Sequence, residues 1–403
     1  MLKKIIVAAA MGTMLLIAGC GKEKTAVPKE INITYVKAPL NIPSILEKNR
    51  DMFGKEFSKD GIEVKFHELT TGPEQTQALA AGELDFLHAL GGTSAIIAAS
   101  NGVDLKITNI YSRSPKGFML ISKSSDIKEP KDLVGKKVAG PKGTILHQLL
   151  LTYLGKGDLK VDDIEFINMG LPEAMAALQS GNVDAALLAG PVALKAIKNG
   201  ANVVTNGEGL VEGIVVTAVS GKFLKENPQL VDRFLKVNEE AVKFIKDDLE
   251  TTLKITAEDT GLSKDEVMEL YPLYDFNTEI KASDIEDLVK TQDFLIENGL
   301  QEKKIDINTI IKNNNRKGWW LGVLILKRGE FEKNLKKNLE RAHYEDIIVE
   351  NNSSKTIVMS LDKYIEIMRE LKKYKEHYHK DSIRKTGDIM KNNFFDILKK
   401  KRA

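Results

Sequence analysis

Along residues 31–200, stretches with the hydrophobic pattern of a strand alternate with stretches that have the pattern of a helix. Runs that alternate apolar and polar residues, or that are short and wholly apolar, predict strands, whereas apolar residues three and four apart predict helices. Strands are expected at residues 31–36, 62–69, 84–90, 105–111, 136–140, 164–169 and 183–189. Helices are expected at residues 42–57, 73–82, 94–102, 144–155, 172–181 and 191–200. Because strands joined through helices pair in parallel, the chain is predicted to have an α/β fold with mostly parallel sheets.

One phrase of this pattern occurs twice. The sequence AAGELDFLHALGG at residues 80–92 and the sequence QSGNVDAALLAGP at residues 179–191 share three positions. Each has a Gly, an Asp three residues later and a second Gly nine residues after the first. Short α/β units can look alike by chance, but the shared interval argues against that explanation. We interpret the phrase as one helix–turn–strand–turn–helix unit placed once in each of two α/β lobes.

Four of the predicted helices begin with small or capping residues at the end of a strand, which is where open α/β sheets bind ligands. These candidate ligand-binding residues are Asn41; Gly91, Gly92, Thr93 and Ser94; Gly143, Thr144 and His147; and Gly190 and Pro191. Gly lets the backbone approach a ligand, and Ser, Thr or Asn can cap free N–H groups. A helix N-terminus attracts an anion by roughly 0.3–1 kcal/mol when exposed. Each site alone could be an ordinary cap, but four converging from two lobes would suit one small anionic group.

Three longer stretches carry a resemblance to a known family. They are TGPEQTQALAAGELDF at residues 71–86, DLVGKKVAGPKGTILHQLLLTYL at 132–154 and FINMGLPEAMAALQSGNVDAALLAGPVALKA at 166–196. With them, residues 30–311 resemble the periplasmic-type substrate-binding proteins of ABC importers, in the aliphatic sulfonate, nitrate and taurine group. The family often has Gly directly after the Asp–aromatic pair, where this chain has Leu87 and His88.

The resemblance implies a two-lobed periplasmic-binding-protein fold of type II with two crossover strands. Lobe 1 would comprise residues 31–113 and 218–311, lobe 2 residues 114–217, and the crossings residues 112–121 and 213–220. It also implies the function. The lobes would close on a small organic anion. An aliphatic sulfonate is the favoured ligand, and taurine or nitrate-like anions are the alternatives. The ligand would pass to a permease and an ATPase, and no cofactor is implied.

The N-terminus predicts export. Lys3 and Lys4 precede an apolar core too short for a membrane span, and the segment ends in IAGC at residues 17–20, which resembles a bacterial lipobox. Cys20 is the only cysteine, so no disulfide can form within the chain. We expect residues 1–20 to be a lipoprotein signal, Cys20 to be acylated and residues 21–30 to be a linker. The protein would then be anchored at the outer face of the cytoplasmic membrane or in the periplasm. An ordinary signal peptide with a chance Cys is the alternative.

Catalytic motifs are missing from the sequence. None of the six His residues forms HExxH, no P-loop or GxSxG occurs, and no thiol would remain after lipidation. No catalytic residue, metal or cofactor is therefore predicted. His147 could touch the ligand or lie at the cleft edge, and His88 is expected to be a packed strand residue. The alternative to a receptor is a binding-protein-fold enzyme or sensor that acts on a small metabolite.

A basic tail follows the family-like region. Residues 312–403 hold 23 Lys and Arg against 13 Asp and Glu, whereas the rest holds 36 against 44. WWLGVLIL at residues 319–326 predicts a strand, and residues 344–380 predict a strand, a turn at 351–354, a strand and a helix capped by Ser360. KTIVMSLDKYIEIM in this small α+β appendage resembles prevent-host-death antitoxins, which implies a DNA- or toxin-binding module. A fused or misjoined reading frame, or a lysine-rich segment without function, would be the alternative.

Overall fold

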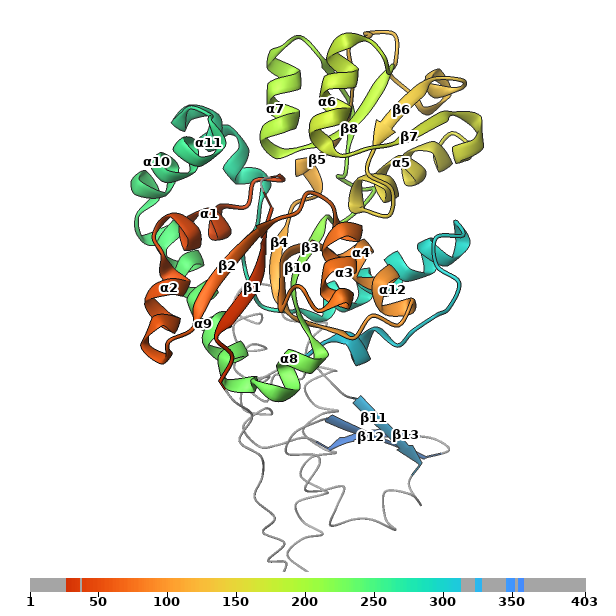
Figure 1. The fold of residues 1–403 in the computed structure, drawn as a ribbon. Helices are drawn as coiled ribbons and strands as arrows, with labels where there is room; N and C mark the ends of the chain where they lie inside the picture. Colours follow the sequence, from red (N-terminus) through yellow and green to blue (C-terminus); the bar gives the residue numbers. More distant parts are fainter. Residues whose placement is uncertain (1–26, 37, 313–322, 328–345, 352–353, 359–403) are drawn as a thin grey trace, which may run out of the picture.

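The protein has two lobes, each built on its own five-stranded sheet (Figure 1). A computed structural model describes residues 27–36, 38–312, 323–327, 346–351 and 354–358. The lobe 1 sheet has the order β2-β1-β3-β10-β4 and consists of β1 Glu30–Tyr35, β2 Glu63–Glu68, β3 Phe86–Gly91, β4 Leu105–Arg113 and β10 Ile214–Ser220. The lobe 2 sheet has the order β7-β6-β8-β5-β9 and consists of β5 Phe118–Ser122, β6 Lys137–Gly140, β7 Glu165–Asn168, β8 Ala185–Ala189 and β9 Asn202–Asn206.

The two sheets share one topology, and both are mixed rather than mostly parallel. In lobe 1, β1 pairs in parallel with β2 and β3, and β10 pairs antiparallel with β3 and β4. In lobe 2, β6 pairs in parallel with β7 and β8, and β5 pairs antiparallel with β8 and β9. The prediction of mostly parallel sheets is therefore wrong in this respect. The reason is that β5 and β10 each follow a crossing from the other lobe and enter their sheet in the opposite direction.

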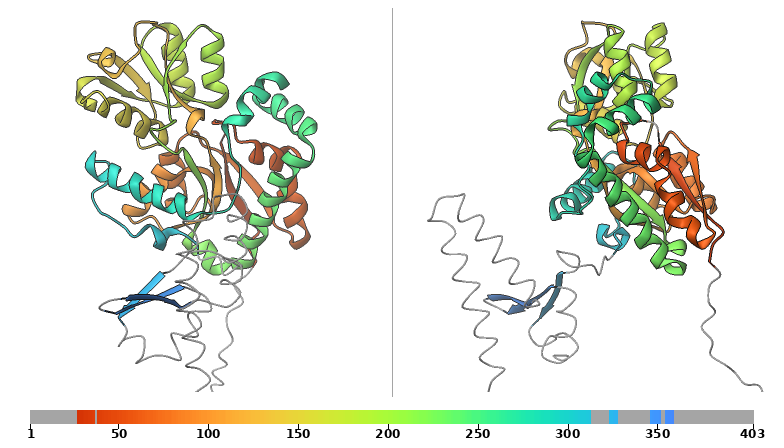
Figure 2. Two further views of the ribbon diagram at one scale, coloured as in Figure 1. Left: turned by 180° about the vertical axis from the view of Figure 1, so that it is seen from behind. Right: turned by 90° about the vertical axis from the view of Figure 1, so that its left-hand side faces the viewer.

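Helices cover both faces of each sheet (Figures 1 and 2). In lobe 1 they are α1 Ile42–Asn49, α2 Met52–Phe57, α3 Gly72–Ala81, α4 Gly92–Ser100, α8 Gly221–Glu226, α9 Pro228–Asp247, α10 Leu249–Thr260, α11 Lys264–Leu270 and α12 Ala282–Glu297. In lobe 2 they are α5 Ile145–Gly155, α6 Leu171–Ser180 and α7 Gly190–Lys198. Short 3-10 turns occur at Ser58–Asp60, Pro115–Gly117, Pro130–Leu133, Val161–Asp163, Tyr271–Leu273 and Ile307–Ile310.

The helix predicted over residues 42–57 is two helices. Asp51 interrupts it with a left-handed backbone (φ 51°), and α2 begins at the next residue. Gly54 has no side chain, and a Cβ there would lie 2.0 Å from Oδ1 of Asp51. The carboxylate of Asp51 therefore occupies the space over the first turn of α2 that a larger residue would fill. Apolar periodicity alone does not reveal such a break.

The two copies of the repeated sequence have the same structure, one in each lobe. Gly82 ends α3 and Gly181 ends α6, each in the left-handed conformation. A carboxylate oxygen of Asp85 accepts a hydrogen bond from the backbone N of Asn32 in β1 at 2.8 Å. Asp184 accepts one from the backbone N of Lys137 in β6 at the same distance. Each copy thus turns the chain after a helix and fixes the following strand beside its parallel neighbour.

Apolar side chains fill three cores. One lies between the lobe 1 sheet and α3, α4 and α12, and a second lies on the opposite face under α2, α8 and α9. The third fills lobe 2 and extends across the junction, since Leu40, Tyr111 and Tyr274 belong to it. The lobes therefore also meet through packed apolar side chains in this structure, not only through the two crossings.

An ion pair between Arg113 and Asp284 holds the start of the first crossing against α12. Nε and Nη2 of Arg113, at the end of β4, donate to the two carboxylate oxygens of Asp284 in α12, each at 2.6 Å. Arg113 also donates to the carbonyl oxygens of Asn277 and Glu279 at 2.9 and 2.8 Å. The segment before α12 is thereby fixed to the point where the chain leaves lobe 1.

The described part of the tail is a three-stranded sheet of β11 Val323–Lys327, β12 Asp346–Asn351 and β13 Ser354–Val358. β11 and β12 pair in parallel, and β12 and β13 form an antiparallel hairpin at the predicted turn, where Asn351 pairs with Ser354. The predicted signal with Cys20, most of the linker, the start of the predicted strand at 319–326 and the helix after Ser360 lie outside the described residues.

Candidate functional site

The start of α4 in lobe 1 faces the start of α5 in lobe 2, and hydrogen bonds join them. Ser94 donates its hydroxyl to the carbonyl oxygen of Gly143 at 2.8 Å, and Thr93 donates to Oε1 of Gln148 at 2.8 Å. Both hydroxyl-bearing residues are buried. The prediction that they cap α4 is wrong, because Gly91 is the N-cap residue and no side chain caps this helix. The two hydroxyls bind the opposite lobe instead.

The loop before α5 has the predicted cap. Oγ1 of Thr144 accepts a hydrogen bond from the backbone N of His147 at 3.4 Å and donates to the carbonyl oxygen of Pro141 at 2.8 Å. Gly143 before it has φ +73°, a conformation that strains residues with a Cβ. Glycine is therefore required here by the backbone, which also brings the Gly143 carbonyl to Ser94.

His147 packs within its own lobe. Its ring lies 4.8 Å from that of Phe166 in β7, and Nδ1 accepts a hydrogen bond from the backbone N of Gly143 at 3.4 Å. Burial, and then the positive charge of Lys142, lower the pKa of His147 to about 4. The ring is therefore neutral at pH 7, with its proton on Nε2. That atom is buried and has no hydrogen-bond partner among the described residues.

Asn41 does not cap α1, contrary to the prediction. Its side chain turns back, so that Nδ2 donates to the carbonyl oxygen of Val36 at 2.7 Å. Its Oδ1 is buried without a partner among the described residues. The backbone N of the preceding Leu40 donates to the hydroxyl of Tyr274 at 3.3 Å. This loop after β1 is therefore held by internal bonds rather than by a capped helix.

At Gly190 the backbones of the two lobes come close together. It begins α7 with φ +53°, and a Cβ there would lie 2.7 Å from the backbone N of Leu40 and 3.0 Å from backbone atoms of Pro39. Pro191 follows in the first helical turn and is buried. The start of α7 thus rests directly on the loop after β1. The four predicted helix starts meet as two pairs, one from each lobe in each pair.

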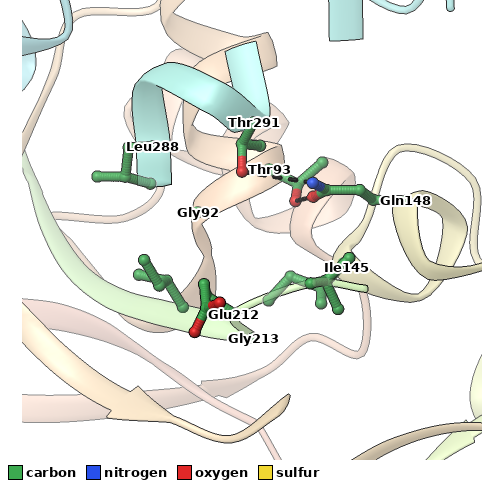
Figure 3. Close-up of a pocket in the computed structure, with 10 residues that line it drawn as sticks. Gly92, Thr93, Ile145, Gln148, Glu212, Gly213, Leu288 and Thr291 are labelled. Atoms are coloured by element: carbon green, nitrogen blue, oxygen red, sulfur yellow. Dashed lines mark hydrogen bonds between the residues drawn. The ribbon is translucent and has the colours of Figure 1, made fainter. Parts of the chain in front are cut away.

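A small cavity lies beside the α4–α5 pair (Figure 3). Its lining residues come from both lobes and the second crossing: Gly92, Thr93, Ile145, Gln148, Val211, Glu212, Gly213, Ile214, Leu288 and Thr291. Nε2 of Gln148 donates to the hydroxyl of Thr291 in α12 at 3.3 Å. The cavity volume is about 10 Å³, which is the space of one water molecule. A small organic anion is larger, so its entry here requires the lobes or these side chains to separate.

His88 lies inside lobe 1, as a packed strand residue should. Its Nε2 is 2.8 Å from a carboxylate oxygen of Glu47 in α1, and its Nδ1 is 3.0 Å from the hydroxyl of Thr217 in β10. Asn238 in α9 donates to the other oxygen of Glu47 at 2.9 Å. Where the family often has Gly, Leu87 therefore packs in the lobe 1 core and His88 joins a buried polar network.

Sequence reasoning missed Gln148, Thr291, Ser114 and Tyr274 at the junction. Gln148 is one residue beyond the predicted His147, so the quoted helix start contained the signal. Ser114 follows the end of β4 in the predicted first crossing and is fully buried. Thr291 and Tyr274 lie in the last part of lobe 1, where no local pattern marks them. Only the fold brings them to the cleft.

Neither a metal site nor a membrane-spanning helix occurs among the described residues. No group of three or more His, Cys, Asp or Glu in the described part of the chain could hold a metal ion. Within the same residues, no helix has the length and apolar character needed to cross a bilayer.

Several known proteins are similar to this chain in sequence. The family model described as NMT1/THI5 like matches residues 56–251. A relative named as an aliphatic sulfonates-binding protein, from Bacillus subtilis (strain 168), is 32% identical over 321 residues, which cover 78% of this chain and 95% of the relative. The Escherichia coli (strain K12) taurine-binding periplasmic protein is 27% identical over 51% of this chain and 64% of its own length.

Solved structures show the same fold. The alkanesulfonate-binding protein SsuA of Xanthomonas axonopodis pv. citri, bound to MOPS, superposes with a TM-score of 0.66 at 24% identity. The match covers 71% of this chain and 99% of that protein. The desulfurization enzyme DSZB superposes with a TM-score of 0.52 at 17% identity, covering 71% and 96% of the two chains. The fold is therefore compatible with binding proteins and with at least one enzyme.

Proposed function

This chain belongs to the NMT1/THI5-like family, alongside the aliphatic sulfonate-binding proteins, and from that premise we propose its function. It is the extracytoplasmic binding component of an ABC importer, and it captures a small organic anion between its two lobes. The anion is an aliphatic sulfonate. The ABC permease and ATPase are the partners that receive it.

One observation supports this proposal above the others: two strand ends from each lobe meet in pairs across the junction. The α4 and α5 starts touch through Ser94 and Gly143, and the α7 start touches Leu40. Backbone N–H groups at helix starts and neighbouring hydroxyls are donors suited to an anion. Because the donors come from both lobes, a bound anion would hold the lobes together.

An enzymatic function is the weaker alternative. Hydrolysis needs a nucleophile with a base beside it. The relatives that cover most of this chain are binding proteins, whereas the enzyme DSZB matches at 17% identity and supports the fold alone. The buried His88 is committed to Glu47 and Thr217. We therefore propose a non-enzymatic receptor.

A panel of anions tests the binding function. The purified protein would be titrated calorimetrically with ethanesulfonate, hexanesulfonate, taurine, nitrate and sulfate. A sulfonate at 100 times its dissociation constant is expected to stabilise the protein by about 2.7 kcal/mol, visible as a rise in Tm. Binding of nitrate or sulfate but of no sulfonate would reassign the ligand, and no binding of any member would refute the receptor function.

The export signal belongs to the same proposal. Residues 17–20 place Cys20 directly after a short apolar core, as lipoprotein processing requires. Each buried acyl CH₂ contributes about 0.8 kcal/mol, so two chains anchor a protein stably where one does not. Cys20→Ala should move the protein from the membrane fraction to the soluble extracytoplasmic fraction. If the variant sediments with membranes as the wild type does, the lipid anchor at Cys20 is wrong.

A further inference from the structure

Ser114 has a buried hydroxyl without a partner at the junction of the lobes. It follows β4, and its backbone N donates to the carbonyl oxygen of Gly213 at 3.2 Å, so the two crossings run side by side here. The residue is 0% exposed, and its Oγ has no hydrogen bond with any described residue. An unpaired buried hydroxyl destabilises a protein, and proteins rarely keep one without a use.

Tyr274 presents a second hydroxyl at the same place. Its oxygen accepts from the backbone N of Leu40 at 3.3 Å, and among the described residues no acceptor takes its proton. The ring stacks on Phe276 with centroids 5.8 Å apart and 7° between the planes, which fixes its direction. Burial raises the pKa of Tyr274, so the hydroxyl keeps its proton at any physiological pH. Tyr274 is therefore a fixed donor that lacks an acceptor.

Gly117 shows that the two hydroxyl-bearing side chains are neighbours. A Cβ placed on Gly117 would lie 2.9 Å from the Tyr274 oxygen and 3.4 Å from Cβ of Ser114. Leu40, which orients Tyr274, is also the residue on which Gly190 of lobe 2 rests. The first crossing, the loop after β1 and the start of α7 thus meet beside the two hydroxyls, and we call these three segments the wall.

Ser112 extends this wall. It is the next-to-last residue of β4 and stands two residues before Ser114. Its Oγ is also fully buried and without a partner among the described residues. Arg113 between them does not compete for the same space, since its guanidinium binds Asp284 at 2.6 Å. The wall therefore offers neutral hydroxyl donors.

We propose that Ser114 and Tyr274 are ligand-binding residues whose hydroxyls donate to the oxygens of the bound organic anion, with Ser112 beside them. The inference rests on the proposed receptor function and deepens it. Leu40 acts on the ligand indirectly, because its backbone N holds the Tyr274 oxygen and leaves the hydroxyl proton for the ligand. Tyr274 lies at the β1–α7 pair of the junction, and Ser114 adjoins Gly213, which lines the small cavity beside α4 and α5.

Two single-atom variants in the full chain test the assignment, with hexanesulfonate and taurine as probes. Ser114→Ala and Tyr274→Phe should each weaken binding about ten-fold or more, as expected for loss of a hydrogen bond to a charged group. Ser114→Ala should leave the Tm unchanged or slightly higher, because it removes an unpaired buried hydroxyl. Tyr274→Phe should lower the Tm slightly, because the backbone N of Leu40 loses its acceptor.

The matched controls are buried hydroxyls that already have partners. Ser122, also 0% exposed, donates to the carbonyl oxygen of Asp184 at 2.7 Å, and Tyr153 donates to that of Lys128 at 3.1 Å. Ser122→Ala and Tyr153→Phe should lower the Tm and leave the affinity for both probes unchanged. This opposite pattern separates a ligand-binding hydroxyl from a structural one.

The outcomes distinguish the two proposals. If the wild type binds neither a sulfonate nor another anion of the panel, the receptor function fails and this assignment fails with it. If the wild type binds hexanesulfonate or taurine and both variants bind equally well, the assignment of Ser114 and Tyr274 alone is wrong. A fall in affinity matched by an equal fall in the controls would also overturn it, since the hydroxyls would then be structural.

Discussion

Gly190 sets how closely the lobes can approach. A Cβ at this position would lie 2.7 Å from the backbone N of Leu40. Backbone atoms cannot move aside to relieve this overlap as the end of a flexible side chain can. Gly190→Ala should therefore hold the lobes apart and weaken sulfonate binding by at least about ten-fold, a loss of about 1.4 kcal/mol. Titration calorimetry would measure it.

Gly181 provides the control for that prediction. Its φ is +76°, similar to that of Gly190, but a Cβ there would meet nothing within 4 Å. Gly181→Ala should cost about 1–2 kcal/mol of stability from backbone strain and leave affinity unchanged. Equal affinities for the two variants would show that the contact with Leu40 does not limit closure.

His147 makes stability depend on pH. Its pKa is about 4 when folded and near 6.5 when unfolded, so between these values the unfolded chain binds more protons. Its contribution to stability is complete above pH 6.5 and is lost as the pH falls toward 4, by up to about 1.4 kcal/mol per pH unit. In urea titrations, His147→Gln should flatten this part of the pH profile. Parallel profiles for the variant and the wild type would show that His147 is not the group responsible.

At the scale of elements, Gln148 links α5 of lobe 2 to two helices of lobe 1. It accepts from Thr93 in α4 at 2.8 Å and donates to Thr291 in α12 at 3.3 Å. Gln148→Leu keeps the size but removes both bonds across the junction. We expect faster ligand dissociation and an affinity about ten-fold lower, because the closed form loses about 0.5–1.5 kcal/mol per hydrogen bond. Stopped-flow release of the ligand would measure this change.

Gln292 is the matched amide that works within one lobe. Its side chain donates to the carbonyl oxygen of Ile305 at 2.9 Å and accepts from the backbone N of Ile305 at 2.8 Å, both inside lobe 1. Gln292→Leu should lower the Tm while the rate of ligand release stays unchanged. If both Leu variants behave alike, the bonds of Gln148 stabilise the fold and not the closed state.

Hydrophobic periodicity was sufficient to predict most helices and strands up to residue 200, because the strand period and the helix period differ strongly there. It missed the break at Asp51, which depends on one residue in a left-handed conformation. It also misassigned Asn41, Thr93 and Ser94 as caps. A side chain that can cap a helix can equally bind another segment, and only the fold decides between Val36, the opposite lobe and the helix's own N–H groups.

At the scale of the whole molecule, the basic tail is proposed to be a separate unit. Lys312 still belongs to lobe 1, since its backbone N donates to the carbonyl oxygen of Ile107 at 2.7 Å and its Nζ binds Asp232 at 2.8 Å. The relative from Bacillus subtilis is covered over 95% of its length, yet the match takes only 78% of this chain. The charge balance reverses at the same point, to 23 basic against 13 acidic residues.

Limited proteolysis tests this separation. Asn-rich, charged joints between units are preferred cleavage sites, so a protease should cut near residues 313–317 first. The larger product should bind the same sulfonate with unchanged affinity, as measured by calorimetry. If that product loses affinity, or if loops elsewhere are cut and residues 313–317 are not, the tail is part of the receptor.

The position of β10 between β3 and β4 has a consequence for how the chain is made. All strands of the lobe 2 sheet come from residues 118–206, one uninterrupted stretch, whereas β4 finds its sheet partner only when residues 214–220 have been synthesised. Contacts between distant segments form late, because a long loop must first be closed. We therefore expect the second lobe to be finished while the first still has a gap in its sheet. The part of the chain that is synthesised first is the part that is completed last.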